Sequence, residues 1–168
     1  VTGLYKVEAK FGSDTYAGAN TPTSVPIATA VQTVAELNAA GNSGYGWERT
    51  TGDATTHTMA DASSAPLVDL YITDFAAGNA GPEYNVASPD MAPTDPGGVT
   101  PSGAWRVNGF TDPLTGENGP LPMHSPTVYF NYTTIDRDPI VLGCYTEDGY
   151  YAMVKVSGIN TGSGEVQT

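Results

Sequence analysis

The chain has 168 residues, of which 6 are Lys or Arg and 18 are Asp or Glu, so its formal net charge is −12 near neutral pH. Six scattered basic side chains cannot form the cationic patch that neutralises phosphates, which excludes nucleic acid and anionic membrane surfaces as partners. The single cysteine excludes an intramolecular disulfide, and no apolar run reaches the ~20 residues of a membrane-spanning helix, so no membrane insertion is expected.

The rest of the composition indicates a folded and secreted protein. Charged residues make up only 14% of the chain, and 20 Gly and 13 Pro accompany them. Hydrophobic residues at 39% supply enough apolar area for a core, so a single β-rich domain over residues 1–168 is expected. Neutral polar surfaces are typical of secreted structural proteins, and a start at Val1 rather than Met favours cleavage of a secretory leader. We therefore expect an extracellular or cell-surface location.

The first eleven residues alternate between apolar and polar side chains and predict a strand with one buried face. A Gly-, Asn- and Thr-rich stretch follows, so two pairings are open: the strand pairs within its own sheet, or it adds to the open edge of a neighbouring subunit. In the second case, residues 1–11 form a strand-exchanging segment. Its intersubunit contacts would come from Val1, Tyr5, Val7 and Phe11.

Residues 25–40 predict the one helix of the chain. Apolar residues recur at helical spacing after Pro26, which suits a first helical turn. Thr23 or Ser24 is a suitable amino-terminal cap, and Gly41 lies where a helix would end. The pattern therefore predicts an amphipathic helix.

The middle of the chain predicts loops around one buried strand. Residues 42–66 are polar and irregular. Residues 67–75 are apolar on both faces, which is typical of a strand inside a sheet. Residues 76–102 contain five prolines and predict a long connection, a length that is uncommon unless the segment makes a contact.

The last third predicts a meander of short strands. Asp148-Gly149 between two apolar, aromatic and β-branched runs is the strongest hairpin signal in the sequence. The whole pattern predicts a mainly β fold, an antiparallel β-sandwich or sheet of about six strands with one helix over residues 25–40 and long loops. The strands predicted in this part cover residues 104–110, 127–135, 139–146 and 150–156.

No arrangement of residues predicts catalysis, so no catalytic residue is assigned. Cys144 lies in an apolar strand, where a thiol is buried and inert. His57 and His124 lie in loop-like stretches, far apart in sequence and without a Gly-x-Ser-x-Gly elbow. Neither a serine triad nor a transition-metal site is expected from them.

Acidic loop residues are candidate calcium ligands, because hard cations bind carboxylate and backbone oxygens. Their spacing does not match the EF-hand loop, and Asp in a turn equally accepts hydrogen bonds from its own backbone. No other cofactor is expected. The candidate ligands are Asp112, Glu117, Asp136 and Asp138.

Two further groups of residues are candidates for contacts with sugars. Aromatic residues in predicted loops would form a sugar-stacking platform or anchor a protein interface. Asn131-Tyr132-Thr133 is a glycosylation sequon within a predicted strand, and it is modified only if that face of the strand is exposed. The loop aromatics are Tyr45, Trp47, Tyr84 and Trp105.

Together these features favour a non-enzymatic structural subunit of an extracellular assembly whose partners are copies of itself. A head-to-tail strand contact does not close and builds a filament, so a pilus-like or thread-like protein is the first interpretation. A virion surface or capsid-decoration protein is an alternative within the same physical class. A carbohydrate-binding or adhesion module, with glycans or a host surface as partner, is an alternative from another class.

Overall fold

The fold was analysed in a computed structural model and is mainly β, as the sequence predicts. In the part of the chain that the structure describes, twelve strands and two short 3-10 helices form the fold, so the expected number of about six strands was too low. None of the helices in this part is long and apolar enough to cross a membrane. The described residues are 5–8, 24–27, 33–34, 42–49, 53–73, 84–94, 104–115, 121–160 and 165–167.

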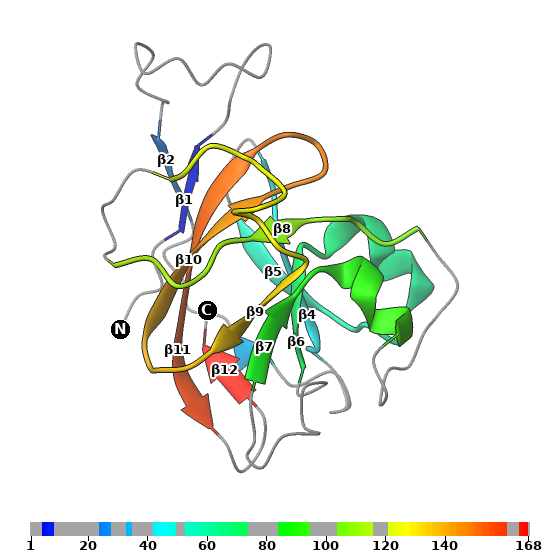
Figure 1. Ribbon diagram of the computed structural model, residues 1–168. Helices are drawn as coiled ribbons and strands as arrows, with labels where there is room; N and C mark the ends of the chain where they lie inside the picture. Colours follow the sequence, from blue (N-terminus) through cyan, green and yellow to red (C-terminus); the bar gives the residue numbers. More distant parts are fainter. Residues whose placement is uncertain are drawn as a thin grey trace.

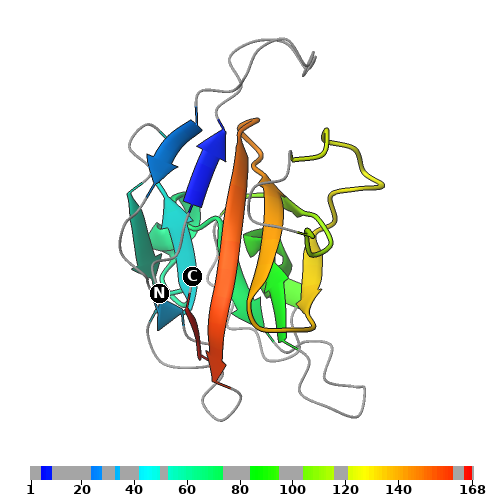
Figure 2. The same ribbon diagram turned by 90° about the vertical axis from the view of Figure 1, so that its left-hand side faces the viewer.

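Seven strands form the first antiparallel sheet (Figure 1). Its two longest strands, β10 and β11, form a hairpin, and β1 lies along the other side of β11 (Figure 2). At the far end of β11, β12 pairs with β11 and with β3. The strands are β1 (Tyr5–Glu8), β2 (Ser24–Ile27), β3 (Thr33–Val34), β8 (Gly109–Phe110), β10 (Ile140–Tyr145), β11 (Tyr151–Asn160) and β12 (Glu165–Gln167).

Five strands form the second antiparallel sheet, in the order β5-β4-β6-β7-β9. Two 3-10 helices, η1 (Ala62–Leu67) and η2 (Pro89–Thr94), lie beside it at the right of Figure 1. Among the described residues, one isolated bridge, between Phe110 and Phe130, connects the two sheets at their border. The strands are β4 (Gly44–Trp47), β5 (Ala54–His57), β6 (Leu70–Thr73), β7 (Tyr84–Ala87) and β9 (Tyr132–Ile135).

The main core lies between the two sheets, which makes the fold a β-sandwich. Alternate residues of each strand point toward the facing sheet, and removal of this apolar surface from water is the main stabilising contribution. The second sheet contributes buried residues such as Leu70, Ile72 and Val86, and the first sheet contributes Leu142 and Val154.

Two smaller apolar clusters cover the outer faces of the sandwich. Met59, Val68 and Trp105 pack with Tyr71 beneath the 3-10 helices, outside the second sheet. On the first sheet, residues 121–130 cover a cluster that consists of Leu121, Tyr129, Val141, Tyr151 and Met153. Both faces of β6 and β10 are therefore buried, which explains why these strands are apolar on both sides. The buried strand predicted over residues 67–75 is confirmed in its central part, which is β6.

The hairpin predicted at Asp148-Gly149 is confirmed. Gly149 has a φ of 87°, a left-handed conformation that glycine adopts without steric cost. Its N–H donates to the carbonyl of Thr146 at 2.8 Å, and the N–H of Thr146 donates to the carbonyl of Tyr150 at 2.9 Å. The turn therefore joins β10 and β11 in continuous register.

The helix predicted over residues 25–40 is wrong where the structure describes this stretch, because β2 and β3 lie within it. Apolar residues there fit a helical spacing, but β-branched residues also occupy alternate positions from Val25 to Thr33. β-Branched side chains favour the extended backbone, which explains the outcome. Pro26 is compatible with this strand, because β2 is an edge strand among the described residues and a proline, which has no N–H, is tolerated in an edge strand.

Three strands lie in segments that the sequence predicts as loops. β4 and β5 fall within residues 42–66, and β7 falls within residues 76–102. The sequence signal was weak in β4 because Gly alternates with aromatic residues. Gly46 is required by a close approach, since a Cβ at this position would lie 1.8 Å from the carbonyl oxygen of Leu67.

We expect Gly46→Ala to destabilise the protein by about 3 kcal/mol, because a methyl group there forces β4 away from the end of η1. Urea unfolding of the variant measures the loss. The exposed substitution Thr115→Ala is the control and should change the free energy of unfolding by less than about 0.5 kcal/mol. A Gly46→Ala protein as stable as the parent would show that the close approach to Leu67 is not maintained.

Candidate functional site

A fully buried carboxylate, Asp69, lies at the centre of the polar contacts between the two sheets. It directly precedes β6, where its N–H donates to the carbonyl of Tyr45 at 2.7 Å. The N–H of Trp47 donates to Asp69 Oδ2 at 3.0 Å. An isolated charge in such a position is strongly unfavourable, so a buried carboxylate requires partners.

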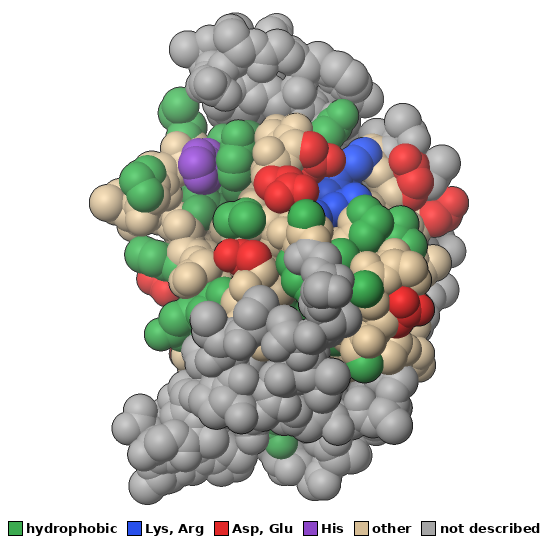
Figure 3. All heavy atoms as spheres, turned by 90° about the vertical axis from the view of Figure 1, so that its right-hand side faces the viewer, with side chains coloured by type: hydrophobic (Ala, Val, Ile, Leu, Met, Phe, Trp, Pro, Cys, Tyr) green, Lys and Arg blue, Asp and Glu red, His purple; other side chains and the backbone are tan. Residues whose placement is uncertain are grey.

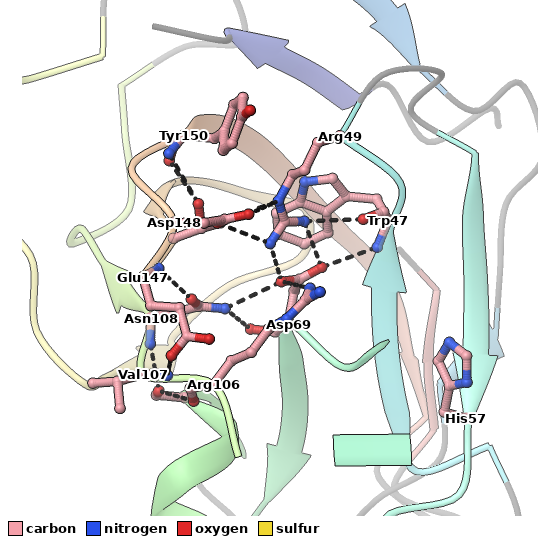
Figure 4. Close-up of polar contacts among 12 residues, drawn as sticks. Trp47, Arg49, His57, Asp69, Arg106, Val107, Asn108, Glu147, Asp148 and Tyr150 are labelled. Atoms are coloured by element: carbon pink, nitrogen blue, oxygen red, sulfur yellow. Dashed lines mark hydrogen bonds and ion pairs between the residues drawn. The ribbon is translucent and has the colours of Figure 1, made fainter. Parts of the chain in front are cut away.

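Two arginines supply the compensating charge (Figure 4). Arg49 binds Asp69 through two parallel hydrogen bonds, from Nη2 to Oδ1 at 2.6 Å and from Nη1 to Oδ2 at 2.8 Å. Arg106 Nη1 donates to the same Oδ1 at 2.6 Å. The Arg49 guanidinium also lies over the ring of Trp47, 5.1 Å from its centroid, which adds a cation–π contact.

Asp148 in the β10–β11 turn completes the ion cluster. Arg49 Nε donates to Asp148 Oδ2 at 3.1 Å, so one guanidinium links a buried and a half-exposed carboxylate. Burial alone would lower the pKa of Arg49, but its bonds with Asp69 and Asp148 raise that pKa above the ordinary value. Partial burial would raise the pKa of Asp148, but hydrogen bonds from Thr146 and Arg49 outweigh it and lower the pKa.

Asn108 extends the cluster toward β8. Its Nδ2 donates to the backbone carbonyl of Asp69 at 2.8 Å, and its Oδ1 accepts from the N–H of Glu147 at 2.9 Å. The N–H of Val107 donates to Glu147 Oε2 at 2.9 Å. We call the five polar side chains that meet here the Asp69 network: Arg49, Asp69, Arg106, Asn108 and Asp148.

The Asp69 network is saturated and acts as a structural centre. Oδ1 of Asp69 accepts from Arg49, Arg106 and Asn108, and Oδ2 accepts from Arg49 and the Trp47 N–H. Both carboxylate oxygens are therefore engaged by donors of the protein itself. These contacts hold four parts of the chain together: β6, the end of β4, the residues before β8 and the β10–β11 turn.

This centre was not predicted from the sequence, although a signal was present. Asp69 is the one charged residue in the apolar run Leu67-Val68-Asp69-Leu70-Tyr71. Acidic residues are almost never fully buried unless they are paired, so an Asp inside a predicted buried strand predicts a basic partner. Which arginines pair with it depends on tertiary structure, because Arg49 and Arg106 are distant in sequence.

A groove lies along β9, the last strand of the second sheet among the described residues. Phe110 and Phe130 exchange two backbone hydrogen bonds of 2.7 and 2.8 Å, which holds β8 against the start of β9. The chain after Phe110 then turns toward β10, where the N–H of Leu114 donates to the carbonyl of Val141 at 2.7 Å. A hollow of about 500 Å³ lies beside β9, and we call it the β9 groove. Its lining is Asp112, Pro113, Phe130, Asn131, Tyr132, Thr133, Thr134 and Asp136.

The β9 groove combines aromatic rings with carboxylates. Phe130 and Tyr132 are 41% and 40% exposed, large fractions for aromatic residues. Asp112 and Asp136 are exposed at the same groove. A second hollow of about 390 Å³ shares Asp112, Pro113 and Phe130 with it, so the depression extends past Phe130 toward Thr127.

The structure brings two of the four predicted calcium ligands to one place. Asp112 and Asp136 both line the β9 groove, whereas Asp138 accepts hydrogen bonds of 3.0 and 3.1 Å from the N–H of Gly158. Glu117 lies outside the described residues. Across the described ranges, no three His, Cys, Asp or Glu side chains gather in a group that could hold a metal ion. The calcium site therefore stays a prediction.

The aromatic platform predicted from the sequence is wrong. Its four members were assigned to exposed loops, but three of them lie in strands and all are at most 9% exposed. A sugar stacks on an exposed ring face, which these residues do not offer. They belong instead to the apolar clusters of the sandwich: Tyr45, Trp47, Tyr84 and Trp105.

The thiol and the two histidines have surroundings of their own. Burial raises the pKa of the Cys144 thiol well above its ordinary range. The His124 ring stacks on Tyr145 with centroids 3.9 Å apart, and His57 Nε2 lies 2.8 Å from the hydroxyl of Thr55. Figure 4 shows His57 well apart from the Asp69 network. Burial lowers the pKa of His57.

The amino-terminal strand pairs within its own chain in this structure. Of the residues predicted to make intersubunit contacts, Tyr5 and Val7 lie in β1, between β11 and β2. Val1 and Phe11 lie outside the described residues. The intersubunit role of the segment stays a prediction, because a strand exchanged between copies would make the same backbone pairs.

No protein-family model, curated protein or solved structure matches this chain. The function is therefore inferred from the residues and their geometry.

We expect Asp69→Asn to destabilise the protein by about 3–5 kcal/mol, because it leaves Arg49 and Arg106 without their shared negative charge. Urea unfolding at pH 7 measures this loss. Asp136→Asn is the matched control: it breaks an exposed ion pair with Arg137 and should cost less than about 1 kcal/mol. Equal effects of the two substitutions would contradict the central role of Asp69.

The lowered pKa of Asp148 predicts a specific acid dependence of stability. A carboxylate with a lower pKa in the folded state stabilises the fold above its unfolded pKa of about 3.9, and this contribution is lost as the pH falls through the folded pKa. The stability difference between the parent and Asp148→Asn should therefore shrink between pH 6 and pH 2 in urea unfolding. A difference that stays constant over this range would contradict the Arg49–Asp148 pairing.

Proposed function

We propose that this chain is a non-enzymatic structural subunit of an extracellular assembly, a pilus-like or thread-like filament held together by β contacts between copies. The observation that carries the proposal is the placement of β1. This strand lies near the amino terminus and makes antiparallel pairs with β11, with Lys6 opposite Met153, Val7 opposite Ala152 and Glu8 opposite Tyr151. Backbone pairs of this kind are the same whichever copy supplies the strand.

Exchange of β1 between copies would produce an open chain of subunits. Each copy would donate its own amino-terminal strand and receive the strand of the preceding copy at β11. Such a contact uses two different surfaces of the subunit, so it propagates as a filament when the rotation between successive copies does not close a ring. A virion coat, the alternative within this class, would use the same kind of contact with closed symmetry.

The described surface supports a role in subunit contacts. Leu67, Val107 and Met123 are large apolar side chains that are at least half exposed. Figure 3 shows hydrophobic side chains around a small group of basic and acidic side chains on one face of the molecule. Aromatic residues, Met and Arg are enriched at protein interfaces, whereas Lys, Glu and Asp are depleted, so Met123 is the member of this set that fits an interface best.

The chemistry of the described residues supports a non-enzymatic role. The one buried carboxylate is saturated by five donors, and the one thiol is buried. Catalysis needs a nucleophile or base in reach of a substrate. The polar side chains of the Asp69 network instead hold strands together.

A second candidate function, a carbohydrate-binding or adhesion module, is supported by the β9 groove. Exposed rings of Phe130 and Tyr132 beside the carboxylates of Asp112 and Asp136 are a combination that suits a pyranose ring. Retention on a glycan array, lost in Tyr132→Ala, would favour this function over the structural one.

A disulfide between β1 and β11 tests the assembly directly. Lys6 and Met153 are opposite each other, and opposite residues in antiparallel strands lie within disulfide range. We expect Lys6→Cys/Met153→Cys protein oxidised as a monomer to remain monomeric, because its strand is locked in its own chain. The same variant oxidised after assembly should give a ladder of covalent oligomers on a non-reducing gel.

Val141→Cys/Lys155→Cys is the matched control, since it links β10 to β11 within a hairpin that strand exchange leaves intact. Its oxidation should not affect fibre formation in sedimentation and electron microscopy. If locked Lys6→Cys/Met153→Cys monomers still form fibres, or if oxidised fibres contain only intrachain disulfides, exchange of β1 is wrong.

A further inference from the structure

The glycosylation sequon Asn131-Tyr132-Thr133 lies in the lining of the β9 groove. It is the one Asn-x-Ser/Thr sequence in the chain. The sequence alone left open whether the strand face that carries it is exposed. The structure answers this for Asn131, which is exposed in the bend immediately before β9.

The main chain at Asn131 is fixed while its side chain is available. The carbonyl of Asn131 accepts a hydrogen bond of 2.8 Å from the N–H of Ser88, which ties the bend to the end of β7. No side-chain hydrogen bond joins the Asn131 amide to any residue that the structure describes. Thr133, the third residue of the sequon, is 4% exposed, so a modifying enzyme must read it before β9 folds into the sheet.

The β9 groove has the size and chemistry to hold a sugar next to this amide. Its volume of about 500 Å³ lies in the range of small-molecule sites. Phe130 and Tyr132, the residues on either side of Asn131, are 41% and 40% exposed and line the same groove. Asp112 and Asp136 offer carboxylate oxygens as acceptors for hydroxyl groups. None of the described lining residues is Lys or Arg, which favours an uncharged sugar.

We propose that Asn131 carries an N-linked glycan and that its first, uncharged sugar packs in the β9 groove against Tyr132. The donor is an activated sugar whose C1 is bonded to a diphosphate, and a glycosyltransferase of the secretory route catalyses the transfer. The bond between Asn131 Nδ2 and C1 forms as the bond between C1 and the diphosphate oxygen breaks. The amide loses one proton, and the diphosphate leaves with the bonding electron pair.

This inference rests on the proposed extracellular function, because a protein meets such a transferase on its way out of the cell. The two can fail separately. Protein that forms fibres with an unmodified Asn131 overturns the glycan alone. Protein that carries the glycan but never assembles overturns the filament alone.

The first test is the intact mass of protein purified from the organism that makes it, before and after treatment with a peptide-N-glycosidase. We expect a mass excess that the enzyme removes, and conversion of residue 131 to Asp in the peptide map. A native protein whose mass equals that of its amino-acid sequence, with Asn131 unmodified, overturns the proposal.

Variants secreted from a host that glycosylates such sequons provide the matched controls. Thr133→Ser keeps the hydroxyl that the transferase requires and should retain the glycan. Thr133→Val keeps the buried shape of the side chain but removes the hydroxyl, and should lose the glycan. Equal modification of the two variants would show that the added mass is not N-linked at this sequon.

Thermal unfolding tests the packing of the sugar in the groove. Removal of the glycan should lower the Tm of the parent by about 2–4 °C, and Asn131→Asp should match the enzyme-treated protein. In Tyr132→Ala, removal of the glycan should change the Tm by much less, because the stacking partner is gone. A glycan whose removal leaves the Tm of the parent unchanged would overturn the packing in the groove.

Discussion

The pairing of one buried carboxylate with two arginines constrains the arrangement of this sandwich. Asp69 can be buried only because Arg49 and Arg106 reach it, and each arginine brings a different part of the chain with it. Arg49 follows β4 and also binds the β10–β11 turn through Asp148, whereas Arg106 leads into β8. Breaking such a pair is costly because the remaining charge stays buried, so the network fixes how the two sheets meet.

The groove along β9 follows from the same constraint. Asn108 anchors the approach to β8, and the two bonds between Phe110 and Phe130 hold that strand at the start of β9. Past this point the chain continues along β10, where the N–H groups of Thr111 and Leu114 donate to the carbonyls of Gly143 and Val141. An exposed asparagine, two aromatic residues and two carboxylates therefore share one hollow, to which residues 130–136 contribute all but Asp112.

Local sequence signals predicted the elements that local interactions determine. The Asp148-Gly149 hairpin and the buried strand β6 follow from turn chemistry and from apolar residues on both faces. The helix over residues 25–40 failed because alternating β-branched residues and pairing with β1 outweighed a helical spacing of apolar residues. Trp47 was placed in a loop because Gly alternates with aromatic residues in β4, and Tyr84 because the four-residue strand β7 lies within a proline-rich stretch. From the sequence, only the need of Asp69 for a basic partner could be predicted, because the tertiary structure determines which arginine contacts the carboxylate.

The low proportion of charged residues and the pairing of β1 with β11 are the observations that support the proposed role of an assembling subunit. Negative-stain electron microscopy of protein taken from its natural source tests this role most directly. Ordered filaments are expected, with a repeating unit at least the size of the 17.4 kDa chain. Native protein that stays monomeric at high concentration and shows no ordered fibres would contradict it.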